Sequence, residues 1–336
     1  MRRPRGEGRA RVWLGRPIHH VNVSCLTFWN HRTLAVFRWG VYHEARVTDP
    51  TTATLQKEAE RLMVRLSAFA DEISQDPREQ IDVLMKHGIR HVEFRSILGI
   101  NVLDLTPAQH ESFRALLRES GFGLSAIGSP IGKIQISDPF EPHLARYETA
   151  LALAEFYEAP RIRVFSFYLP EGSDPASARD EVLKRMGELA RLAADRGVTL
   201  MLENEKGIYG DTAARVLDVL ESVGSPALRH AFDPANYCEV GQPIDEAWSS
   251  LREWTAHFHV KDYSKSLERN VPAGEGDGQI PRLIADAVAH GYDGFCVLEP
   301  HLVVAEKSYG FTGPERFGDA ARALQSALDA AAIAYA

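Results

Sequence analysis

Polar side chains that can hold a cation end four apolar runs in the second half of the chain. The runs end in Glu203 and Glu205, in Asp233, in His257 and His259, and in Glu299. A short apolar run bounded by turn residues is typical of a buried parallel strand, and the side-chain period of two puts Glu203 and Glu205 on one face. Carboxylates with one imidazole suit a divalent cation of the Mn, Co, Mg or Zn group. Acids that follow a strand also occur in solvated loops, which is the alternative interpretation.

These side chains meet only if the strands lie parallel in a barrel, because all strand carboxyl ends then open on one rim. From residue 63 onward, strand-like and helix-like runs alternate, as expected for βαβ units. Strands are predicted at 65–70, 91–95, 123–127, 162–167, 198–202, 227–232, 255–261 and 294–299. Helices are predicted at 76–87, 107–120, 143–157, 176–195, 211–223, 244–253, 279–290 and 314–334. Eight such strands close into a (β/α)8 TIM barrel. The alternative, an open doubly wound sheet, lacks its glycine fingerprint after the first strand.

The strand ends carry a resemblance to a known family. The motifs are Leu202-Glu203-Asn204, Phe232-Asp233-Pro234, His257-Phe258-His259-Val260-Lys261-Asp262 and Leu298-Glu299-Pro300-His301. They resemble the metal-site motifs of the xylose isomerase-like TIM barrels, which include sugar phosphate isomerases and epimerases, inosose-processing enzymes and endonuclease IV. The similarity runs from about residue 63 to the end of the chain and includes the opening segment 66–73. The resemblance implies that Glu203, Asp233, His259 and Glu299 are the ligands of one divalent metal ion.

The same resemblance implies a metal-dependent epimerase or isomerase acting on a ketose or related polyol. Glu203 and Glu299 are the implied acid and base, with an enediolate between them. An inosose-type dehydratase on the same metal site and a non-catalytic sugar- or metal-binding barrel are the alternatives. In ketose 3-epimerases a His, an Arg and a second Glu stand where this chain has Asn236, Lys265 and Tyr209. The substrate's identity therefore does not carry over.

Further polar residues near the predicted strand ends are expected to contact a small-molecule substrate. These are Arg95, Lys133, Asn236, His257, Lys261 and Lys265. Glu93 shares a strand face with Arg95, and His257 faces the same way as His259, because each pair is two residues apart. For each residue the structural alternative is a salt bridge on the rim or a solvated loop position. The glycine-rich segment 274–278 lacks the Lys-Ser/Thr of a P-loop and carries two acids, so no nucleotide site is expected there.

Composition restricts the partners. The 336 residues hold three scattered cysteines and no apolar run long enough to cross a membrane, so a reducing, cytoplasmic location is expected. Endonuclease IV is disfavoured, because its trinuclear site needs histidines after the second and third strands and one at position 236. The barrel portion is acidic, the wrong sign for nucleic-acid binding. The sequence is compatible with a homo-oligomer.

The first part of the chain differs in charge from the rest. Residues 1–48 hold nine arginines and two glutamates, a net charge of +7. Because the whole chain has a net charge of −8, residues 49–336 have a net charge of −15. Basic residues with tryptophans suit a nucleic-acid arm or a transit segment. The preferred hypothesis is that residues 1–62 form a disordered or mis-assigned extension and that Met63 is the natural start, because the barrel-like sequence begins there.

Overall fold

The computed structural model describes residues 63–302 and 312–336, which include all eight predicted strands. The predicted basic extension, residues 1–62, lies outside the described residues, so its hypothesis stays a prediction.

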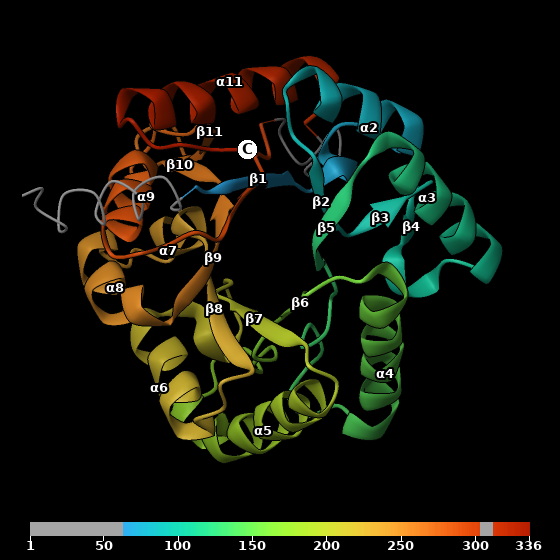
Figure 1. Ribbon diagram of the computed structural model, residues 1–336. Coiled ribbons are helices and arrows are strands. Elements are labelled where there is room, and N and C mark those ends of the chain that lie inside the picture. Colours follow the sequence, from blue (N-terminus) through green and yellow to red (C-terminus); the bar gives the residue numbers. More distant parts are fainter. Residues whose placement is uncertain (1–62, 303–311) are drawn as a thin grey trace, which may run out of the picture. The chain divides into compact units, whose positions relative to one another are not determined.

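Within the described residues, eight parallel strands close into a barrel in the order β1-β12-β9-β8-β7-β6-β5-β2 (Figure 1). The strands are β1 Arg65–Ala68, β2 His91–Phe94, β5 Gly123–Ile127, β6 Arg161–Val164, β7 Thr199–Glu203, β8 Leu228–Phe232, β9 Thr255–Val260 and β12 Phe295–Leu298. Figure 1 shows the helices as a ring around these strands. They are α2 Pro77–Lys86, α3 Pro107–Ser120, α4 Phe140–Tyr157, α5 Arg179–Asp195, α6 Ala213–Val223, α8 Ile244–Leu251, α9 Ile280–Ala289 and α11 Pro314–Ala330. The predicted (β/α)8 TIM barrel is confirmed.

Several short elements at the loops were not predicted. They are the hairpin strands β3 Ser96–Ile97 with β4 Ile100–Asn101, the hairpin strands β10 Asp262–Ser264 with β11 Arg269–Val271, and the helix α7 Pro234–Glu239. Short 3-10 turns lie at Ala70–Glu72, Val102–Asp104, Pro175–Ala178, Tyr209–Asp211 and Arg252–Trp254. Elements of two to six residues give no readable hydrophobic period, which explains why the sequence pattern did not predict them.

Helix ends follow local chemistry, as α3 illustrates. The Thr106 hydroxyl accepts a hydrogen bond from the Gln109 backbone N–H at 3.3 Å, and the Gln109 side chain reaches back to the Thr106 backbone N–H. This reciprocal cap satisfies N–H groups that the first turn leaves unpaired. Gly121 ends the helix with φ of 70°, a left-handed conformation that costs glycine little.

The interior of the barrel is lined partly by polar residues. In β9, Phe258 and Val260 belong to the main apolar core, whereas the alternating His257 and His259 are fully buried beside Glu93 of β2. Phe69, Phe295 and Val297 form a separate small apolar cluster. Barrel interiors are usually filled by branched aliphatic side chains. Buried histidines and acids at this place therefore need an electrostatic explanation.

The glycine-rich segment 274–278 binds a carboxylate of the protein itself. The backbone N–H groups of Gly274 and Gly278 donate to Asp262 at 2.8 and 2.9 Å, and that of Gly276 donates at 3.2 Å. A Cβ at Gly276 would lie 2.3 Å from Asp262 Oδ1, so glycine is required for this close approach. Because Asp262 already occupies these donors, the three glycine N–H groups are not free to bind a phosphate.

Candidate metal centre

The four predicted metal ligands converge at one end of the barrel strands. One ligand atom from each of Glu203, Asp233, His259 and Glu299 lies within 4.8 Å of the others, and all four residues are buried. Glu203 ends β7, Asp233 follows β8, His259 lies in β9 and Glu299 follows β12. These strands are neighbours in the barrel, so parallel pairing alone brings residues almost a hundred apart in sequence to one place.

Buried polar atoms of this cluster lack partners among the described residues. Asp233 Oδ2, His259 Nδ1 and Glu299 Oε2 form no hydrogen bond there. His259 Nδ1 lies 3.3 Å from Glu203 Oε1 and 3.7 Å from Glu299 Oε2. A buried polar atom without a hydrogen bond is costly, and three such atoms beside the Glu203 carboxylate suit a shared cation. Three carboxylates and one imidazole fit a divalent ion such as Mg, Mn, Co or Zn.

Local hydrogen bonds fix the orientation of Asp233. Its Oδ1 accepts from the Asn236 backbone N–H at 3.0 Å and so caps the short helix α7. Its backbone N–H and C=O are both bonded to the Asn204 side chain at 3.0 Å. Oδ2 is left facing the cluster, where Lys261 Nζ approaches it at 2.7 Å as an ion pair without hydrogen-bond geometry. The unpredicted helix α7 therefore orients one candidate ligand.

A guanidinium group occupies the second oxygen of each glutamate. Arg163 Nη1 lies 3.2 Å from Glu203 Oε2, and Arg95 Nη1 lies 2.8 Å from Glu299 Oε1. Both guanidinium groups pack 4.6 Å from the centre of the Phe69 ring. Each glutamate therefore offers one oxygen to the cluster and binds an arginine with the other.

These charges shift the pKa values of the cluster in opposite directions. Burial raises the pKa of Glu203, but His259 and Arg163 outweigh it and lower the value to about 2. Burial also raises the pKa of Glu299, but the positive charges of Lys261, His301 and Arg95 outweigh burial and hold this pKa well below its usual range. For Asp233, burial prevails over Lys261 and, with the two glutamates, raises the pKa to about 7. Asp233 is therefore the carboxylate on which a proton competes most with a metal ion near neutral pH.

A second ionic group lies on the rim beside Glu299. His301 Nε2 contacts Glu72 Oε1 at 3.0 Å and Glu299 Oε1 at 3.2 Å. Burial lowers the pKa of His301, but these two carboxylates raise it to about 9, so the imidazole is protonated at neutral pH. Arg95 bridges the same group, since it also binds Asp71 at 2.7 Å and Glu72 at 3.0 Å.

The residues predicted to contact substrate have different surroundings. Arg95, Lys261 and Asn236 touch candidate ligands, the last through Glu203 at 3.4 Å. Lys133 lies on the rim, half-buried, and pairs with Glu205 at 2.8 Å. His257 is fully buried and forms a hydrogen bond with Glu93, so it does not lie on the rim where a substrate contact was expected.

Lys265 is exposed between β10 and β11, and no contact within the described residues joins its side chain to the four ligands. Their roles toward a substrate remain predictions.

Two residues close to the cluster were missed or misplaced by sequence reasoning. Arg163 was not singled out, although an arginine alternating with Ile162 and Val164 in a strand was a readable signal. Glu93 was placed on the rim with Arg95, whereas its exposed fraction is 0% and it faces His257 and His259 inside the barrel. Sequence distance hides such pairs, because their strands meet only through closure of the barrel.

Residues 81–327 match the family model of the xylose isomerase-like TIM barrel. The chain belongs to this family. It is 26% identical to 3-dehydroshikimate dehydratase of Bacillus anthracis over 156 residues, which is 44% of this chain and 56% of that protein. It is 31% identical to 2-epi-5-epi-valiolone 7-phosphate 2-epimerase of an Actinoplanes species over 195 residues, 55% of this chain and 67% of that protein. The matches to the first three curated relatives span about half of those proteins' lengths.

The fold is shared with solved structures. A xylose isomerase-like TIM barrel protein from Mycobacterium smegmatis, crystallised in complex with magnesium, superposes with a TM-score of 0.60 at 20% identity. The match covers 80% of this chain and 99% of that one. The relatives of this chain thus include both an epimerase and a dehydratase. Among the described residues, no helix combines the length and the apolar character needed to cross a membrane.

Proposed function

We propose that this chain is a divalent-metal-dependent epimerase or isomerase that acts on a ketose or related polyol through an enediolate. The observation that supports it most is the group of buried atoms of Asp233, His259 and Glu299 that form no hydrogen bond and lie beside Glu203. When bound, the ion acts as a Lewis acid that polarises a carbonyl and stabilises the negative charge developing on its oxygen. The epimerase among the relatives supports the same reaction class.

Glu203 and Glu299 are the proposed acid and base. In the barrel order, β12 flanks β9 on one side and β7 lies beyond β8 on the other, so the two carboxylates approach His259 from different sides. Inversion at a carbon needs removal of a proton from one face and its return on the opposite face. The glutamate that removes the proton has to be ionised, and the glutamate that returns one first has to take up a proton from water. A positioned acid or base is worth roughly 10²–10⁴ in rate.

The arginines make the two glutamates unequal. A carboxylate bonded to a guanidinium is a weaker base, because the positive charge favours the ionised form. Arg163 is buried and also donates to the Gly128 carbonyl at 3.2 Å, so it stays on Glu203. The Arg95 side chain is 23% exposed and keeps Asp71 and Glu72 as partners if it leaves Glu299. Lys261 and His301 remain near Glu299 after such a movement, but its guanidinium partner can leave and that of Glu203 cannot, so Glu299 is the glutamate proposed to remove the first proton.

Dehydration is the second candidate, and a specific observation favours it. His301 carries a proton at neutral pH and lies 3.2 Å from Glu299. After Glu299 removes a proton beside a carbonyl, an acid at that place can protonate a β-hydroxyl so that it leaves as water. The dehydratase among the relatives supports this chemistry.

Metal analysis followed by a substrate panel in deuterated water tests the proposal. Purified protein loaded with Mn²⁺ is incubated with ketoses and inososes, and the products are followed by NMR. Deuterium at the carbon beside the carbonyl together with inversion supports epimerisation. Loss of water with a new conjugated product supports dehydration instead. Stoichiometric metal without turnover or deuterium exchange on the whole panel contradicts both and favours a binding barrel.

A further inference from the structure

The His259 imidazole lies between two sets of carboxylates. Its Nδ1 faces the candidate metal cluster, 3.3 Å from Glu203 Oε1. Its Nε2 faces the barrel interior, 3.4 Å from Glu93 Oε1, an ion-pair contact without hydrogen-bond geometry in the metal-free protein. If Nδ1 binds a metal ion as a lone-pair donor, the proton of the neutral ring has to stay on Nε2, where Glu93 can accept it.

Glu93 is buried beside residues that are far from it in the sequence. It comes from β2, which is separated from β9 by β1 and β12 in the barrel order, and its exposed fraction is 0%. The contacts of its carboxylate within residues 63–302 and 312–336 are His257 and His259. A fully buried acid is rare unless it is paired. Glu93 therefore extends across the barrel interior and contacts the two histidines.

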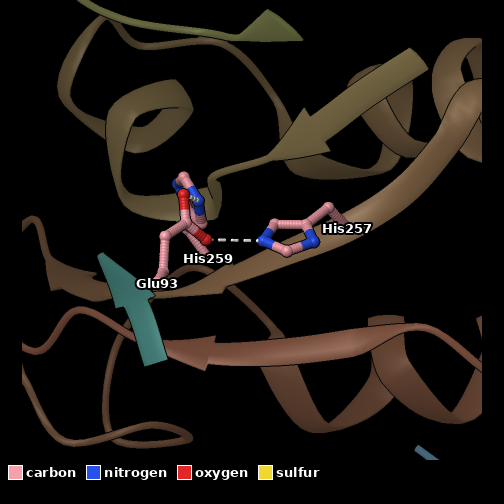
Figure 2. Close-up of side chains that lie close together, drawn as sticks. All are labelled: Glu93, His257 and His259. Atoms are coloured by element: carbon pink, nitrogen blue, oxygen red, sulfur yellow. Dashed lines mark hydrogen bonds and ion pairs between the residues drawn. The ribbon is translucent and has the colours of Figure 1, made fainter. Parts of the chain in front are cut away.

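His257 holds Glu93 in this position. Its Nε2–H donates to Glu93 Oε2 at 2.6 Å, a short charge-assisted bond. Figure 2 shows the Glu93 carboxylate facing both rings, with one oxygen toward each. The centres of the His257 and Phe295 rings lie 6.1 Å apart. Glu93 therefore lies between His257 and His259 and contacts both rings.

We propose that Glu93, held by His257, is a positioning residue that fixes the His259 ring and its tautomer for metal binding through Nδ1. An anionic acceptor on Nε2–H also makes Nδ1 a stronger donor to a metal ion. This chain of contacts also explains why two histidines and an acid fill a barrel interior that aliphatic side chains usually occupy. The inference rests on the proposed metal centre and goes beyond it, since neither Glu93 nor His257 is a ligand.

The test compares Co²⁺ binding in the full chain and in three variants. Glu93→Gln keeps the shape and removes the charge, Glu93→Asp keeps the charge on a shorter side chain, and His257→Asn removes the anchor. Ser67→Ala is the matched control, because Ser67 is a fully buried barrel residue whose hydroxyl bonds Ser125 at 2.7 Å. Affinity is measured by chelator competition, ligand geometry by the Co²⁺ absorption spectrum, and folding by the melting temperature without metal.

Glu93→Gln is expected to weaken Co²⁺ binding about 10–100-fold and to change the spectrum, the usual effect of losing such an outer partner. Glu93→Asp should recover part of the affinity, and Ser67→Ala should bind like wild type. Co²⁺ affinity within twofold of wild type together with an unchanged spectrum in Glu93→Gln overturns the inference. If that variant does not fold, His257→Asn decides in the same way, with an expected loss of several-fold.

Two outcomes separate this inference from the proposed function. If wild type binds no Co²⁺, the metal centre itself is wrong and the inference falls with it. If wild type binds one ion and the Glu93 and His257 variants bind it equally well, the inference alone is wrong. Two ions per chain would also overturn it, because Glu93, His257 and His259 would then hold a cation of their own.

Discussion

Binding of a divalent metal should weaken by about tenfold or more between pH 8 and pH 6, because Asp233 has to be ionised to act as a ligand. Burial, reinforced by the neighbouring glutamates, raises the pKa of this carboxyl to about 7 in spite of Lys261. A group with that pKa is about nine-tenths ionised at pH 8 and about one-tenth at pH 6, which gives the tenfold change.

His259 adds to the same effect. Burial lowers its pKa, but Glu203 and Glu93 outweigh burial and raise it well above the ordinary value. The ring nitrogen that faces the cluster therefore also has to lose a proton before it can bind metal. The affinity should fall about tenfold per pH unit for each proton displaced, so its pH dependence steepens below pH 7.

The sign of the stability effect follows from the same shifts. Asp233 and His259 both have folded-state pKa values above their ordinary ones, so each stabilises the metal-free fold at low pH and loses that contribution as pH rises through its folded pKa. For Asp233 this loss extends from about pH 4 to about pH 7. The gain in melting temperature on adding metal should therefore be larger at pH 8 than at pH 6.

Calorimetric titration with Mn²⁺ at pH 6, 7 and 8, in two buffers of different ionisation enthalpy, measures both the affinity and the protons released. Asp233→Asn is the control: it should bind metal more weakly and release one proton fewer at pH 6. Equal affinity at pH 6 and pH 8 with no proton release in wild type would refute the reasoning.

Three further predictions concern the glutamates, Arg163 and the first part of the chain. Glu203→Gln and Glu299→Gln should each lower the rate about 10²–10⁴-fold at saturating metal; near-wild-type turnover of both would rule out the two-carboxylate mechanism. Arg163→Met leaves the buried Glu203 without its guanidinium partner at 3.2 Å, so the free energy of unfolding of the metal-free protein, measured in urea, should fall by about 3–5 kcal/mol. An unchanged urea midpoint would show that Glu203 does not depend on this ion pair. Deleting residues 1–62 should leave metal affinity and melting temperature unchanged, because the barrel strands all lie between Arg65 and Leu298; loss of folding would show that the segment belongs to the structure.

The sequence by itself determined the barrel and the residues that cluster at its rim. The strand that ends in Glu203 and the strand that ends in Glu299 are apolar runs bounded by turn residues, and such local patterns do not depend on the rest of the fold. Once the strands are taken as parallel, the convergence of their polar ends follows from geometry. The gathering of Glu203, Asp233, His259 and Glu299 could therefore be predicted without coordinates.

Only the tertiary structure decided what surrounds these four residues. The contact between Glu93 and His257 joins positions 164 residues apart, and it depends on which strands lie opposite each other in the closed barrel. Arg163 reaches Glu203 from the neighbouring strand β6, while Lys265 is exposed because a hairpin follows β9. A one-dimensional pattern gives the face of a strand on which a side chain lies. The charged groups that surround this side chain depend on how the barrel closes and on the loops. Both bring together residues that are far apart in the sequence.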